Sequence, residues 1–106
     1  MKILFKNGTV VNADGSCRTD VLVCGEKIQL MGAHIDSPEA KVVDCEGLLL
    51  FPGAIDAHTH FDLDVANTTT ADDFASGSRA ALRGGTTAVH DFACPHQGGP
   101  PQQRVE

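Results

Sequence analysis

A short apolar run that leads into two histidines limits the structures open to this chain. Residues 48–51 are apolar, a Pro-Gly pair interrupts the run, and residues 54–57 then read as a short buried strand. His58 and His60 follow at the spacing i, i+2. Side chains alternate along a strand, so both imidazoles lie on one face, with Cα atoms about 6.5 Å apart. Two imidazoles at this separation can bind one metal ion, and zinc is the usual ion for hydrolysis.

The surroundings of the histidine pair favour the end of a barrel strand over a solvated strand. A His-x-His tripeptide by itself also occurs by chance on solvated strands. Here Asp56 lies on the same face as the pair, and polar residues at 62, 64, 67 and 68 follow, as expected where a buried strand opens into a loop. In (β/α)8 enzymes the chemistry lies at the carboxyl ends of such strands. The pattern therefore predicts a metal site at a strand end.

Length and charge exclude several classes of protein. The chain has 106 residues, which allows one small domain, whereas a complete (β/α)8 barrel takes about 250 residues. The formal net charge of −6 argues against nucleic acid or an anionic membrane as a partner, since both require clustered Lys and Arg. No apolar run is long enough to span a membrane, and the first residues lack the features of a signal peptide. We expect a cytoplasmic protein.

Residues 1–50 read as a series of short strands separated by turn signals. Strands are expected at residues 3–5, 9–11, 20–24, 27–31 and 41–45. The pair Asn7-Gly8 predicts a two-residue hairpin between the first two strands. No charged or histidine cluster in this part has the spacing of metal ligands, and His34 reads as a surface residue. The expected role of this part is packing.

Residues 51–95 read as one β-α-β unit. The strand that carries the histidines leads to a polar loop and then to a helix from about residue 71 to residue 83. Thr70 is the expected N-cap, with Asp73 as its capping-box partner, and Gly84-Gly85 ends the helix. We expect four residues to form the face of the helix that packs on the sheet: Phe74, Ser78, Ala81 and Leu82. A second parallel strand is expected at residues 86–92, with His90 as a core or loop residue without a metal.

Several segments together resemble the dihydropyrimidinase (hydantoinase) branch of the amidohydrolase superfamily of metal-dependent hydrolases. Residues 52–60, Pro-Gly-Ala-Ile-Asp-Ala-His-Thr-His, resemble the first barrel strand of that superfamily. The branch is indicated by the further segments at residues 6–12, 20–23, 70–74, 77–81, 84–87 and 91–93. The resemblance extends from residue 2 to about residue 99. The related allantoinases and dihydroorotases share the histidine pair but usually continue with a Glu/Arg-Pro-Gly pattern that is absent here.

The resemblance implies an α/β fold, namely the N-terminal part of a (β/α)8 TIM barrel preceded by strands of a small β-sandwich domain, with the barrel incomplete. It implies His58 and His60 as ligands of a binuclear Zn²⁺ site, whose other family ligands are a carboxylated lysine, two histidines and an aspartate on later strands. It implies a small cyclic amide or imide as substrate, such as a dihydropyrimidine or a hydantoin, and a homo-oligomer for the intact enzyme. The apolar residues Phe61, Leu63 and Val65 are the candidates for contacting the substrate.

The end of the chain departs from this pattern. No lysine follows Lys41, and residues 96–106 contain paired prolines with no apolar period, which predicts an irregular, truncated or frameshifted tail. We therefore expect an inactive N-terminal fragment with no catalytic residue assigned within it. Three alternatives remain open at this point. The first is a non-catalytic dihydropyrimidinase-related binding or assembly module, the second is an allantoinase-like or dihydroorotase-like hydrolase, and the third is a β-rich scaffold in which the histidines bind nothing.

Overall fold

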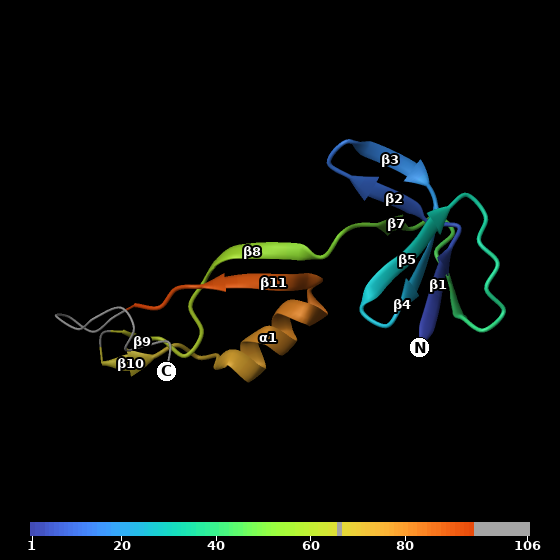
Figure 1. The fold of residues 1–106 in the computed structure, drawn as a ribbon. Helices are drawn as coiled ribbons and strands as arrows, with labels where there is room; N and C mark the ends of the chain where they lie inside the picture. The colour runs from blue at the N-terminus through green and yellow to red at the C-terminus, as the bar shows by residue number, and fades with distance from the viewer. Residues whose placement is uncertain (66, 95–106) are drawn as a thin grey trace. The chain divides into compact units, whose positions relative to one another are not determined.

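The computed structural model describes residues 1–65 and 67–94, which fall into two compact units. The first unit spans Met1–Pro52 and consists of strands and turns, whereas the second begins at Gly53 and includes a helix (Figure 1). The predicted three-part division at residues 1–50, 51–95 and 96–106 stays a prediction. Its last part, which includes His96, lies outside the described residues.

Seven strands form two sheets in the first unit. The four-stranded sheet has the order β5-β4-β1-β6, and the three-stranded sheet has the order β3-β2-β7. The strands are β1 (Lys2–Lys6), β2 (Thr9–Asn12), β3 (Gly15–Arg18), β4 (Asp20–Cys24), β5 (Lys27–Gly32), β6 (Lys41–Asp44) and β7 (Leu49–Leu50).

The predicted hairpin at Asn7-Gly8 is wrong. β1 pairs with β4 and β6 of its own sheet, and β2 pairs with β3 and β7 of the other sheet. Asn7 has φ 66°, its backbone N–H donates to Asp20 at 2.9 Å, and its side-chain amide donates to Asp44 at 2.8 Å. These bonds fix a turn that carries the chain from one sheet to the other. The hairpin on β2 is instead closed by the two residues between Asn12 and Gly15.

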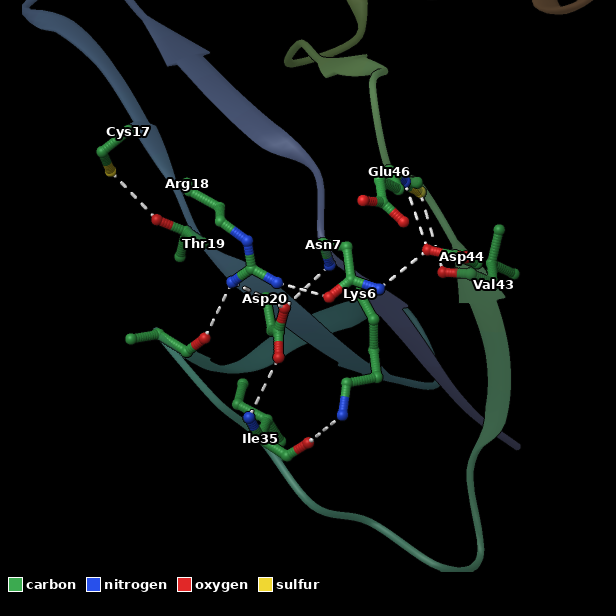
Figure 2. A network of polar contacts seen from close by, with 12 residues as sticks. Lys6, Asn7, Cys17, Arg18, Thr19, Asp20, Ile35, Val43, Asp44 and Glu46 are labelled. Carbon is green, nitrogen blue, oxygen red and sulfur yellow. Dashed lines mark hydrogen bonds and ion pairs between the residues drawn. The ribbon is translucent and has the colours of Figure 1, made fainter.

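A small apolar cluster and a buried carboxylate stabilise the four-stranded sheet. Leu4, Leu22 and Ile35 form the cluster, and burial of each such side chain contributes about 1.5–3 kcal/mol. The side chain of Asp20, the first residue of β4, is fully buried, and Figure 2 shows its bonds to Asn7 and Ile35. It accepts hydrogen bonds from the backbone N–H groups of Asn7 at 2.9 Å and Ile35 at 3.0 Å, and these bonds hold the pKa of Asp20 below its usual value.

The second unit has the predicted β-α-β order. β8 (Ala54–Thr59) and β11 (Thr86–Asp91) pair in parallel, and α1 (Phe74–Arg83) lies between them in the chain. Two short strands, β9 (Asp64–Val65) and β10 (Thr68–Thr69), pair in antiparallel orientation within the connecting loop. This order confirms the parallel strand pair that the sequence predicts.

The start of the helix differs from the prediction. The N-cap is Asp73, not Thr70, because Asp73 and Ser76 form a reciprocal capping box. The Ser76 N–H donates to the Asp73 carboxylate at 2.7 Å, and the Asp73 N–H donates to the Ser76 hydroxyl at 3.1 Å. Thr70 instead accepts a hydrogen bond from the Leu63 N–H through its hydroxyl. The end is as predicted, since Gly84 is the C-cap and Gly85 has φ +89°.

The packing of the second unit also differs from the prediction. The sequence predicts that residues 54–57 are buried, but the Ile55 side chain is 67% exposed. Two residues of the predicted helix face are also exposed, Phe74 at 57% and Leu82 at 62%. The residue of α1 that is buried is Gly77. Five of the six residues of β8 are exposed, so within the described residues its faces lack the cover that parallel strands normally receive. No helix in the described ranges is long and apolar enough to cross a membrane.

Candidate metal centre

The two histidines of the sequence motif meet at the carboxyl end of β8. His58 is the fifth residue of β8, and His60 follows directly after the strand. Their Nε2 atoms lie 3.1 Å apart, and their ring centroids are separated by 5.0 Å with an interplanar angle of 67°. His58 is exposed and His60 is half-buried. The predicted convergence of the two rings on one point is therefore present in the structure.

The distance between the two Nε2 atoms suits a shared divalent ion. Two nitrogens bound to zinc at about 2.0–2.1 Å in a tetrahedron are about 3.3 Å apart, close to the 3.1 Å observed. The Nδ1 atom of His60 is buried and has no hydrogen-bond partner among the residues that the structure describes. A metal-ligating imidazole usually donates its second N–H to a carboxylate or carbonyl, so this nitrogen lacks the partner that a finished site provides. The donor set fits half of a zinc shell.

Among the described residues, the pair is not part of a larger group of metal ligands. In residues 1–65 and 67–94 no group of three or more His, Cys, Asp and Glu side chains could hold a metal ion. Asp56, expected on the histidine face, uses its carboxylate to accept the backbone N–H of His58 at 3.1 Å. His90 lies in β11 and is exposed, so it is neither the core residue nor the loop residue that the sequence predicts, whereas His34 is exposed as predicted.

Asp91 and Phe92 lie next to the histidines, and the sequence did not identify them as parts of the site. The Phe92 ring lies 4.5 Å from the His58 ring and 5.6 Å from the His60 ring, measured between centroids. The Asp91 carboxylate accepts hydrogen bonds from the Thr59 hydroxyl at 2.9 Å and the Phe61 N–H at 2.8 Å. Both residues stand at the carboxyl end of β11, and the parallel pairing brings that end next to the histidines. Their position as the last two residues of the second predicted strand, at residues 86–92, was the signal that could have identified them.

The three residues proposed for substrate contact lie in different surroundings. Phe61 packs edge-on against Phe74 with 5.8 Å between ring centroids, and Leu63 is 7% exposed. Val65 lies in β9 and is 52% exposed. Phe61 and Leu63 thus serve the packing of the loop, whereas Val65 is open to solvent. Contact between these side chains and a substrate stays a prediction.

Comparison with known proteins gives a consistent result. Residues 49–99 match the model of the Amidohydrolase family. The chain is 42% identical to the D-hydantoinase of Geobacillus stearothermophilus over 106 residues, which is all of this chain and 22% of that protein. It is 45% identical to a D-phenylhydantoinase of Escherichia coli over 93 residues, which is 86% of this chain and 20% of that protein.

Solved structures agree with the sequence relatives. The crystal structure of dihydropyrimidinase from Brevibacillus agri superposes with a TM-score of 0.91 at 40% identity, and it covers 99% of this chain and 23% of that one. A crystal structure of a D-hydantoinase gives a TM-score of 0.91 at 39% identity with the same coverage. The chain therefore spans between 20% and 23% of the length of these relatives.

Proposed function

We infer that this chain, a relative of the hydantoinases and dihydropyrimidinases of the Amidohydrolase family, carries part of the metal site of a hydrolase that opens cyclic amides. The observation that supports this proposal is the approach of the His58 and His60 Nε2 atoms to 3.1 Å at the carboxyl end of a parallel strand. The substrate class is a dihydropyrimidine, a hydantoin or a related cyclic imide, as the names of the relatives suggest.

We assign the second unit to the start of a (β/α)8 barrel and the strands of the first unit to a small β-sandwich domain that precedes the barrel in the chain. Parallel strands in such barrels are covered by helices on one side and by barrel contents on the other. The exposure of Ile55 at 67% is consistent with a barrel strand that is covered by helices and strands of the rest of the barrel. The intact enzyme is expected to be a homo-oligomer.

The part of the reaction that we assign to this chain is the binding of a divalent metal ion. We propose that this ion is Zn²⁺. His58 and His60 would each contribute Nε2, and the Phe92 ring limits the space in which the two imidazoles can turn. When bound, divalent metal ions polarise an amide carbonyl and lower the pKa of water toward about 7, which neutral amide hydrolysis requires. A catalytic zinc takes about three protein ligands, so we expect the isolated chain to bind metal without turnover.

Metal titration of matched variants tests this proposal. Binding of Zn²⁺ and Co²⁺ is measured by calorimetry and visible absorption for the wild type, His58→Ala, His60→Ala and the control His90→Ala, which removes an exposed imidazole of the same unit. Loss of an outer-shell partner already weakens metal binding about 10–100-fold, so loss of a ligand is expected to cost at least as much. Equal affinity in the wild type and His58→Ala would contradict the site.

Turnover is a separate measurement on the same material. Ring opening of hydantoin and dihydrouracil by the Zn²⁺-loaded chain is expected to stay at the uncatalysed rate. Turnover that a chelator abolishes would contradict the expectation that the chain alone is inactive. We expect the wild type to bind metal without turnover, and we expect His58→Ala and His60→Ala to lose the metal binding. Absence of metal binding in all variants would favour a scaffold in which the histidines have no ligand.

A further inference from the structure

We propose that Asp91 is a positioning residue that fixes the orientation of His60 by holding the backbone on both sides of it. This inference rests on the metal site proposed above, because it concerns how one of its two ligands is held. Asp91 touches neither imidazole through any described contact. It acts through Thr59 and Phe61, the residues that flank His60 in the chain.

The bonds of Asp91 converge on a single oxygen atom. Oδ1 of Asp91 accepts a hydrogen bond from the Thr59 hydroxyl at 2.9 Å and another from the Phe61 N–H at 2.8 Å. The Phe92 N–H donates to the Thr59 carbonyl at 3.1 Å, which adds a third link between the same two segments. Hydrogen bonds to an ionised carboxylate are about twice as strong as neutral ones. The backbone is therefore fastened immediately before and immediately after the ligand.

His60 needs such support because the regular strand ends one residue earlier. β8 stops at Thr59, and Asp62, two residues after His60, has a left-handed φ of 48°. The chain thus leaves the sheet at the point where a ligand must be aimed within a fraction of an ångström. The buried Nδ1 of His60 has no hydrogen-bond partner in the described part of the chain, so the ring is not oriented through its second nitrogen. Orientation then depends on the backbone.

The arrangement separates the support from the ligand atoms. Thr59 pairs with Asp91 across the two strands, and their side chains meet on one face of the sheet. The rings of His58, His60 and Phe92 contact one another on the other face, as the alternation of side chains requires. Asp91 therefore supports the site from the face of the sheet opposite to the two imidazoles.

The test uses the full 106-residue chain and four variants. Asp91→Ala removes the acceptor, and Asp91→Asn keeps an acceptor oxygen without the charge. Thr59→Val removes the hydroxyl bond to Asp91, together with the 3.3 Å contact of the same hydroxyl with the His90 carbonyl, with little change in volume. Asp14→Asn is the control, because it changes the charge equally at an exposed residue of the first unit. Three quantities are measured: Co²⁺ affinity by visible absorption, exchange of the Phe61 amide proton, and the nuclear Overhauser effect between the His58 and His60 ring protons.

We expect Asp91→Ala to weaken Co²⁺ binding by about tenfold or more, as loss of an outer-shell partner does. The Phe61 amide should exchange faster in this variant. Asp91→Asn should retain most of the affinity and of the amide protection, and Thr59→Val should fall between Asp91→Asn and Asp91→Ala. Asp14→Asn should match the wild type. Wild-type affinity in Asp91→Ala, or an Asp91→Asn variant as weak as Asp91→Ala, would overturn the proposal.

Two controls keep the outcome decisive. Amide protection in α1 reports whether the second unit is folded. If Asp91→Ala loses this protection, Thr59→Val is used in its place. Weaker Co²⁺ binding by Thr59→Val with a protected helix supports the positioning role of Asp91, and unchanged binding overturns it. If the wild type binds no Co²⁺, the metal site itself fails. The ring-to-ring effect between His58 and His60 then decides on Asp91 alone, since its loss in Asp91→Ala supports positioning and its persistence overturns it.

Discussion

Gly77 in α1 lies directly against the ring of Phe61, so that a Cβ atom at position 77 would stand 2.6 Å from Cδ1 of that ring. Real Cβ contacts are essentially never this short. The Phe61 ring cannot retreat easily, because it packs against Phe74 and its backbone N–H is bonded to Asp91. Absence of a side chain at position 77 is thus what lets the loop after the histidines close on the helix.

The first prediction concerns Gly77→Ala. Alanine favours a helix over glycine by about 1 kcal/mol, whereas overpacking costs about 1–3 kcal/mol, and the clash involves several atoms of a rigid ring. We expect the clash to prevail, so that the second unit is destabilised by up to about 2 kcal/mol after the gain in helix propensity is subtracted. Amide exchange in α1 measures this. Ser78→Ala, at an exposed neighbouring position, should instead slow exchange, and equal protection in both variants would contradict the contact.

The second prediction concerns the helix cap. The Ser76 backbone N–H donates to the Asp73 carboxylate and holds the pKa of Asp73 below its usual value. The carboxylate therefore stabilises the helix above about pH 3.9, and this contribution is lost as the pH falls through the lowered pKa. Asp73→Ala should speed exchange of the Ser76 amide several-fold at neutral pH. Asp73→Asn, which preserves the cap, should retain slow exchange with less dependence on acid, and identical behaviour of both variants would be the contrary result.

The third prediction concerns the buried carboxylate of the first unit. Asp20 accepts one backbone N–H on each oxygen, but the Asn amide has only one acceptor, so Asp20→Asn turns an NH₂ group toward a donor. We expect a loss of about 1–3 kcal/mol in the free energy of unfolding of this unit at pH 7. Urea titrations at several pH values measure it, with Asp14→Asn as the exposed control.

The pH dependence of the same pair of proteins provides an independent check. The pKa of Asp20 is lowered in the folded state, chiefly by the hydrogen bonds from Asn7 and Ile35, so its contribution is complete above the unfolded value of about 3.9 and declines as the pH falls through the folded value. The stability difference between wild type and Asp20→Asn should therefore shrink in acid. A difference that is constant from pH 7 to pH 3 would contradict this.

The fourth prediction concerns Phe92. Its ring lies within 5.6 Å of both imidazole rings, so ring currents should shift the Cε1 and Cδ2 protons of His58 and His60 upfield. Phe92→Leu removes the ring while keeping an apolar side chain, and both sets of shifts should move toward the values of the exposed His34. The spectrum of His34 serves as the internal reference. Unchanged His58 and His60 shifts would show that the ring does not contact them in solution.

The sequence predicted local features well where the relevant signal was also local. Alternation along residues 54–60 was enough to bring His58 and His60 to one face, and Gly84-Gly85 was enough to end the helix. The N-cap was misassigned because Thr70 and Asp73 are both good caps. The decision between them depends on Ser76, whose hydroxyl completes the box only for Asp73.

Features that depend on distant pairing were predicted poorly. Asn7-Gly8 has the composition of a hairpin turn, but β1 finds its partners at β4 and β6, and the bonds from Asn7 to Asp20 and Asp44 favour a different path. Burial of β8 was also predicted wrongly, because an apolar strand gives no information on whether covering elements are at hand. Asp91 and Phe92 escaped notice because their contacts join residues about 30 positions apart.

The bonds from Asp91 to Thr59 and Phe61 reach across 32 and 30 positions of sequence, and this sets a limit for protein engineers. A short peptide that contains the His-x-His motif would include both imidazoles but not Asp91, whose carboxylate accepts the bonds from Thr59 and Phe61. Grafting the motif onto another scaffold would require the second strand to travel with the first, in parallel register. The smallest unit that could be transferred with its support is therefore the β8–β11 strand pair, not the His-x-His tripeptide alone.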